Sequence, residues 1–107
     1  MQNQLIAEIV TFRAAPGVPP ETMRSRAEAI GPWLAACPGF LSRALSLAED
    51  GTWTDHVIWA SLDQAMAAAA KIMDEPCAAP FMAAIDGPSV AMGHAPVLVR
   101  QAGQSST

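Results

Sequence analysis

The chain has 107 residues, a formal charge of −4 at pH 7 and an apolar fraction of 51%. These values are typical of one globular domain and exclude a disordered chain. The six Lys and Arg residues do not supply the clustered cations that bind nucleic acid, and the longest apolar run, at residues 65–70, is too short to span a membrane.

The two ends of the chain set the domain limits that we expect. The N-terminal residues lack the charged-then-apolar layout of a signal peptide, so we expect a cytoplasmic protein with Cys37 and Cys77 as free thiols. Cys77 follows a proline at a predicted helix start, where the pKa of a thiol can be lowered, and a small buried thiol is the alternative. Residues 1–100 are predicted to form a single domain, and the small polar residues 101–107 a flexible tail.

The spacing of apolar residues and of Pro and Gly divides the domain into strands and helices. In chain order the predicted elements are a strand at 4–13, a helix at 20–36, strands at 40–47 and 53–60, a helix at 61–76, a short helix at 77–85 and a strand at 90–99. Pro20 lies at the start of the first helix, where proline costs least, and Gly31-Pro32 is expected to kink that helix. Asp50-Gly51 predicts a hairpin between the second and third strands.

The second helix has a clear start and a predicted apolar stripe. Ser61 and Gln64 fit a capping box, and Pro76 is expected to end the helix. The residues expected to face the core are Leu62, Ala65, Met66, Ala69 and Met73. In the last strand, Pro96 indicates an edge position or a bulge.

The predicted order is β-α-β-β-α-β, which is the ferredoxin-like arrangement. We therefore predict an α+β fold, in which a four-stranded antiparallel sheet carries both helices on one face.

The sheet face that the helices leave uncovered is also predicted to be apolar. The first strand places Ile6 and Val10 on one face and Ala7 and Ile9 on the other, and the third strand is similarly apolar on both sides. Because soluble monomers avoid large exposed apolar patches, we expect two copies to pack sheet against sheet as a homodimer. Burial of about 800 Å² per partner would supply many kcal/mol before entropic costs. The alternative is a monomer with scattered exposed apolar side chains.

The third strand carries the strongest candidate for chemistry. Alternation places Trp53, Asp55, Val57 and Trp59 on one face and His56 on the other. A carboxylate between two tryptophans on a half-buried face would be desolvated, which raises its pKa and suits a general base or acid. The alternative is that Asp55 is structural and hydrogen-bonded to a loop or a helix end.

His94 and several large apolar side chains complete the predicted pocket. Gly93 permits close backbone approach beside His94, whose imidazole either faces the pocket or is structural. Trp33, Trp53 and Met66 are predicted to bind the substrate, with ordinary core packing as the alternative for each.

We expect neither a metal nor a cofactor. The two histidines and two cysteines show no CxxC, HxH or HExxH spacing, and the chain has no phosphate-cradling glycine loop and no GxSxG motif.

The sequence resembles the antibiotic biosynthesis monooxygenase family over residues 5–99. The matching stretches are Pro38-Gly39-Phe40-Leu41-Ser42, Asp50-Gly51-Thr52, Trp59-Ala60-Ser61 and the alanine-rich helix that follows. The resemblance implies a homodimer whose sheets form a dimeric α+β barrel, with a pocket between sheet and helices in each subunit. Enzymes of the family oxygenate polyphenolic substrates without metal or flavin, or degrade haem.

The resemblance also implies roles for residues of the third strand. In the quinone-forming enzymes, a tryptophan and an asparagine of this strand belong to the active site and correspond here to Trp59 and Asp55. The carboxylate of Asp55 departs from that pattern, and the chain contains no tyrosine to match the tyrosines of those enzymes. The haem-degrading relatives use a histidine on the following helix, and residues 62–85 contain none, which argues against haem degradation.

Two functions follow as hypotheses. The first is cofactor-independent oxidation of a small aromatic or apolar molecule, with Asp55 as the base, Trp59, Trp33 and Met66 shaping the pocket, and His94 stabilising an oxyanion. The second is a non-catalytic dimeric module that binds a small apolar ligand, or a stress-related protein of the same superfamily, and the missing tyrosines favour it. A purely structural interaction domain would instead have a pocket filled by its own side chains.

Overall fold

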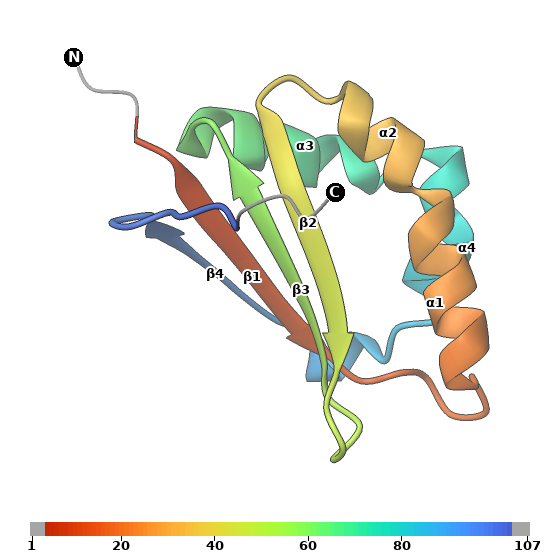
Figure 1. The fold of residues 1–107 in the computed structure, drawn as a ribbon. Coiled ribbons are helices and arrows are strands. Elements are labelled where there is room, and N and C mark those ends of the chain that lie inside the picture. Colours follow the sequence, from red (N-terminus) through yellow and green to blue (C-terminus); the bar gives the residue numbers. More distant parts are fainter. Residues whose placement is uncertain (1–3, 104–107) are drawn as a thin grey trace.

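The computed structural model describes residues 4–103, and the elements follow one another in the predicted order (Figure 1). They are β1 (Ile6–Phe12), α1 (Pro20–Ala29), α2 (Gly31–Ala36), β2 (Phe40–Leu47), β3 (Trp53–Trp59), α3 (Leu62–Ile72), the 3₁₀ helix η1 (Pro76–Ala78), α4 (Ala79–Ala83), the 3₁₀ helix η2 (Gly87–Ser89) and β4 (Ala91–Pro96). The strands form an antiparallel sheet in the order β2-β3-β1-β4, with the helices on one side. This is the ferredoxin-like α+β fold, so the predicted fold class is confirmed.

The strand register separates a sheet face covered by the helices from an open face. Alternate residues of β1 and β3 lie opposite one another on the covered face, namely Ile6 with Trp59, Glu8 with Val57, Val10 with Asp55, and Phe12 with Trp53. His56 lies on the open face and is exposed. The alternation predicted for the first and third strands therefore has the correct phase.

Aromatic side chains connect the covered face to the helices. Phe12 stacks on Trp53 with ring centroids 6.3 Å apart, and its edge meets Phe81 of α4 at 5.9 Å. At the other end of the sheet, Phe40 packs edge-to-face on Trp59 at 5.8 Å. Such pairs add to the burial energy of the core, and the Phe12–Phe81 pair joins the sheet to helix α4.

The turns of the first half follow from glycine and proline. The predicted hairpin joins β2 to β3, with Gly51 at a φ of +91°. Gly39 has a φ of +86°, and a Cβ at this position would overlap the side chain of Gln64. The expected kink at Gly31-Pro32 is a break, because α1 ends at Ala29 and α2 begins at Gly31.

Helix α3 begins as predicted but buries only part of the predicted stripe. The Ser61 hydroxyl oxygen accepts a hydrogen bond from the backbone N–H of Gln64 at 3.2 Å and caps the helix. Ala65 and Ala68 are the buried residues, whereas Met66 is 52% exposed. The predicted stripe is correct at Ala65 and wrong at Leu62, Met66 and Met73, which are exposed. Alanines lie on several sides of this helix, so apolar spacing alone does not select the side that packs on the sheet.

The last elements differ from the prediction mainly in their bounds. Helix α3 ends at Ile72, before Pro76, and the short helix predicted at 77–85 is divided between η1 and α4. Pro96 is the last residue of β4, which is an edge strand as predicted. Residues 101–103 of the predicted tail are exposed, and residues 1–3 and 104–107 lie outside the described part of the chain.

The helices of residues 4–103 are all too short or too polar to cross a membrane. Both cysteines are free thiols, as expected, with Cys37 partly buried and Cys77 exposed. Partial desolvation and the neighbouring Glu75 carboxylate raise the pKa of the Cys77 thiol. Both sequence-based alternatives for Cys77, a lowered pKa and a buried thiol, are therefore wrong.

Candidate functional site

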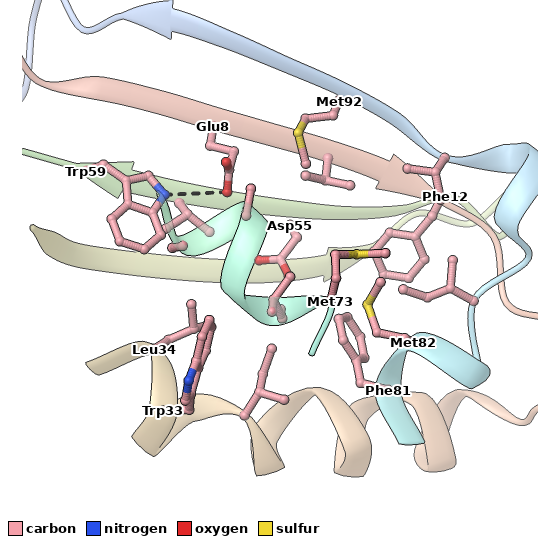
Figure 2. A pocket seen from close by; sticks show the side chains of 18 of the residues that line it. Glu8, Phe12, Trp33, Leu34, Asp55, Trp59, Met73, Phe81, Met82 and Met92 are labelled. Carbon is pink, nitrogen blue, oxygen red and sulfur yellow. Dashed lines mark hydrogen bonds between the residues drawn. The ribbon is translucent and has the colours of Figure 1, made fainter. Parts of the chain in front are cut away.

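A cavity of about 250 Å³ lies between the covered face of the sheet and the helices (Figure 2). Helices α2, α3 and α4 contribute only apolar side chains to its lining, including Trp33, Leu34 and Phe81. On the opposite side, two carboxylates, Glu8 and Asp55, extend from the sheet toward the helices. The site is thus an apolar chamber with its charged groups confined to the sheet. Its free volume argues against a structural domain whose pocket is filled by its own side chains.

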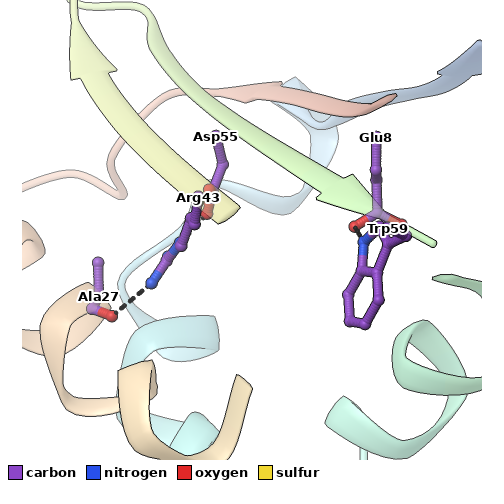
Figure 3. Close-up of polar contacts among 5 residues, drawn as sticks. All are labelled: Glu8, Ala27, Arg43, Asp55 and Trp59. Carbon is purple, nitrogen blue, oxygen red and sulfur yellow. Dashed lines mark hydrogen bonds and ion pairs between the residues drawn. The ribbon is translucent and has the colours of Figure 1, made fainter. Parts of the chain in front are cut away.

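Asp55 is held by an arginine of the neighbouring strand (Figure 3). Arg43 donates from Nε to Asp55 Oδ1 at 2.9 Å and from Nη2 to Oδ2 at 2.7 Å. The third nitrogen, Nη1, donates to the carbonyl oxygen of Ala27 on α1 at 2.9 Å, and the guanidinium lies 5.9 Å from the centre of the Phe81 ring. This two-pronged pair ties β2, β3 and α1 together and engages both oxygens of Asp55.

Glu8 is the second buried carboxylate, and residues of both neighbouring strands contact it. The Trp59 indole N–H donates to Glu8 Oε1 at 3.4 Å, which is a long hydrogen bond (Figure 3). On the other side, His94 Nε2 lies 2.8 Å from Glu8 Oε2. Glu8 is 8% exposed, so three adjacent strands build a largely buried polar cluster next to the apolar chamber.

The sequence-predicted site residues fall into two groups. Asp55, Trp59 and Trp33 line the cavity, and His94 contacts Glu8 from the edge strand. Trp53 is buried but stacks on Phe12 in the core. Met66 points away from the cavity on the exposed side of α3, because the buried side of that helix passes through Ala65 and Ala68.

Glu8 and Arg43 belong to the site and were not selected from the sequence. The alternation that singled out Asp55 as a carboxylate on an apolar face also places Glu8 on that face with Ile6 and Phe12. The same pattern could therefore have identified Glu8. Arg43 is the only charged residue of β2, but its role depends on the register between β2 and β3, which shifts at Phe40/Ser42.

Within residues 4–103, His, Cys, Asp and Glu side chains do not gather in groups of three that could hold a metal ion. The polar side chains in and beside the cavity form two separate clusters, Asp55 with Arg43 and Glu8 with His94 and Trp59.

A comparison with protein-family models and with curated protein sequences finds no match. Among solved structures, the fold resembles SnoaB, a cofactor-independent oxygenase from Streptomyces nogalater, with a TM-score of 0.63 and 19% identity over 92% of this chain and 96% of that chain. An antibiotic biosynthesis monooxygenase-like protein from Bordetella bronchiseptica has a TM-score of 0.74 and 16% identity over 90% of this chain and 99% of that chain. A heme-degrading protein from Mycobacterium tuberculosis has a TM-score of 0.63 and 19% identity over 95% of this chain and 100% of that chain.

These comparisons define the class of fold. The chain has the fold of antibiotic biosynthesis monooxygenase-like proteins, which confirms the predicted resemblance at the level of the fold. A shared fold at such identities does not carry a shared reaction, so activity has to be inferred from the residues of the cavity.

Proposed function

We propose that the cavity binds a small aromatic or apolar molecule and that the protein oxidises it with molecular oxygen, without a cofactor. The observation that carries this proposal is the apolar chamber of about 250 Å³ with buried carboxylates on its sheet side. A chamber of this kind excludes water from a bound ring system and presents it to a base. The fold shared with an oxygenase described as cofactor-independent is consistent with this chemistry.

The proposed reaction begins with removal of a proton, because a carbanion or phenolate reacts with oxygen more readily than its neutral parent. Asp55 as the base stays a prediction, and its pairing with Arg43 makes Glu8 a second candidate. Trp33 and Trp59 would hold the ring system through their apolar faces, and His94 would act through Glu8.

One observation favours the second candidate function, ligand binding without turnover. Both oxygens of Asp55 are occupied by the guanidinium of Arg43, so the base predicted from the sequence is already satisfied within the protein. The absence of tyrosine from the sequence favours the same function.

The experiment that separates the two functions starts with the molecule that copurifies with the protein. Native mass spectrometry identifies it, and the isolated complex is then incubated in air in an oxygen-electrode cell. Uptake of oxygen together with an oxidised product supports the proposed function. A molecule that is recovered unchanged, with no uptake above the protein-free control, contradicts oxidation and supports binding alone.

We further propose that the protein acts as a homodimer in the cytoplasm. Apolar side chains that a single copy leaves in solvent support the dimer, above all Leu98 and Val99, which are 86% and 85% exposed. The cytoplasmic location rests on the sequence alone and stays a prediction.

A further inference from the structure

Glu8 is a buried carboxylate whose hydrogen-bond partners do not use all of its acceptor sites, so it can still accept a proton. Its Oε1 receives only the long hydrogen bond from Trp59, and its Oε2 faces the imidazole of His94. A carboxylate offers about four lone-pair sites, so Oε1 retains acceptor capacity where Glu8 lines the cavity. We propose that Glu8 is the proton acceptor of the cavity, an inference that rests on the proposed function and names the group that starts its reaction.

The comparison with Asp55 supports this choice. A single guanidinium binds both Asp55 oxygens at 2.9 and 2.7 Å, so a ligand must displace a bidentate partner to reach them. Glu8 has no such partner among the described residues: His94 contacts one oxygen, and the Trp59 N–H approaches the other at 3.4 Å. The helices that face Glu8 add only apolar side chains to the cavity, so His94 is the titratable group that contacts it.

His94 lies between Glu8 and solvent and acts as a positioning residue. Its side chain is 19% exposed, it belongs to the edge strand β4, and it is not part of the cavity lining. A proton accepted by Glu8 therefore has a route to solvent along the edge of the sheet, while the ligand stays in the apolar chamber.

The test uses 2-tetralone, a fused aromatic ketone with an acidic CH₂ group next to the ring. In the expected step the C–H bond breaks, the proton bonds to a Glu8 oxygen, and the electron pair moves to the ketone oxygen as an enolate. Return of a deuteron from D₂O completes a cycle in which nothing is oxidised. NMR measures deuterium incorporation under nitrogen, and quenching of tryptophan fluorescence measures binding in the same buffer.

Glu8→Gln is expected to slow protein-catalysed exchange by about a hundredfold, in the range typical of a lost general base, and to change the affinity for 2-tetralone much less. Glu8→Asp keeps a carboxylate and should retain part of the exchange, so the result does not depend on one variant. Glu28→Gln alters a surface glutamate whose side chain is 69% exposed, and it should exchange like the wild-type protein.

His94→Gln keeps a hydrogen-bond donor and removes the chargeable imidazole. We expect the rate of exchange from the bound ligand to fall while the affinity for 2-tetralone stays unchanged, because His94 contacts Glu8 Oε2 but does not line the cavity. A purely structural role of His94 would weaken binding of 2-tetralone along with exchange, and that result would contradict its role as a positioning residue.

The remaining outcomes separate this inference from the proposed function. If 2-tetralone binds and Glu8→Gln exchanges as fast as the wild-type protein, Glu8 is not the acceptor. Loss of exchange in Asp55→Asn but not in Glu8→Gln assigns the role to Asp55 and also overturns the inference. If 2-tetralone neither binds nor exchanges, the proposed function fails and the acceptor fails with it. Exchange without oxygen uptake in air would support Glu8 as the proton acceptor and would contradict the proposed oxidation by molecular oxygen.

Discussion

Arg43 and Asp55 form a pair in which each partner depends on the other. Their side chains are 13% and 12% exposed, and Arg43 also supplies the donor for the Ala27 carbonyl. Loss of one partner from such a pair leaves an uncompensated charge in a poorly hydrated place. The pair therefore holds β2, β3 and α1 together beside the cavity, whatever reaction occurs there.

We predict that Arg43→Met lowers the free energy of unfolding by about 3–5 kcal/mol, because the Asp55 carboxylate is left without its cation. Urea denaturation at neutral pH measures the change. The matched control is Arg24→Met, which breaks a pair with Glu28 whose side chains are 68% and 69% exposed. That substitution should cost less than about 1 kcal/mol. Equal losses in the two variants would contradict a structural role for the Arg43–Asp55 pair.

At the scale of single residues, the sequence predicted which face of the sheet a side chain lies on better than which side chains it contacts. Alternation placed Asp55 and Trp59 correctly on the covered face, because the period of a strand is a property of its backbone. The contacts of Asp55 with Arg43 and of Glu8 with His94 depend on registers between strands that are distant in sequence. No local pattern encodes those registers, so the polar clusters could not be derived from spacing.

At the scale of elements, helix breaks and caps were predictable. Which side of the alanine-rich helix α3 packs on the sheet was not. Pro32 and the Ser61 cap act within a few residues of themselves. The cap forms as expected, and the helix is interrupted at Gly31-Pro32 by a break where a kink was expected. The buried side of α3 is selected by the sheet beneath it, where Ala65 and Ala68 fit and the longer Met66 does not. The methionines left outside the core then become available for other roles.

Three elements place methionines where the cavity opens to solvent. Met73 at the end of α3, Met82 of α4 and Met92 of β4 all line the cavity and are 69%, 36% and 52% exposed. Methionine is flexible and polarizable, and it adapts to ligands of different shapes. These three side chains form an adaptable rim on the route into the chamber.

We predict that replacing Met73 and Met92 together by serine weakens binding of the neutral fluorescent probe N-phenyl-1-naphthylamine. Loss of roughly 1 kcal/mol of apolar contact per side chain corresponds to about a fivefold weaker affinity for each. Met66→Ser is the matched control, because Met66 is also 52% exposed but lies outside the cavity. Fluorescence titration measures all the variants. Equal weakening by the control would show that the probe binds elsewhere on the surface.

At the scale of the whole molecule, the open face of the sheet is less apolar than the sequence indicated. Ile9 is 39% exposed on this face, but Ile58 is already buried within the single chain. Ser42, Thr54 and His56 lie on the same face between small residues such as Ala44 and Ala7. The strand patterns alone identified apolar positions correctly, but they did not show how far neighbouring side chains of the same chain would cover them.

The proposed homodimer consequently depends on the open face together with the apolar segment that follows β4. Leu98 and Val99 of that segment are the most exposed large apolar residues of the described chain. A stable contact needs about 800 Å² from each copy, which an open sheet face with an adjoining apolar segment can supply. Light scattering at micromolar concentration is expected to return twice the chain mass of 11.2 kDa.

Ile9→Lys is predicted to shift the protein toward the monomer, because burying an unpaired ammonium between two sheets costs more than one side chain contributes. Leu62→Lys places the same charge on α3, where Leu62 is 46% exposed on the helical side, and it should leave the mass unchanged. If both variants and the wild-type protein scatter as single chains, the open face is not an interface. If Leu62→Lys alone dissociates the dimer, the two copies meet through the helical layer instead.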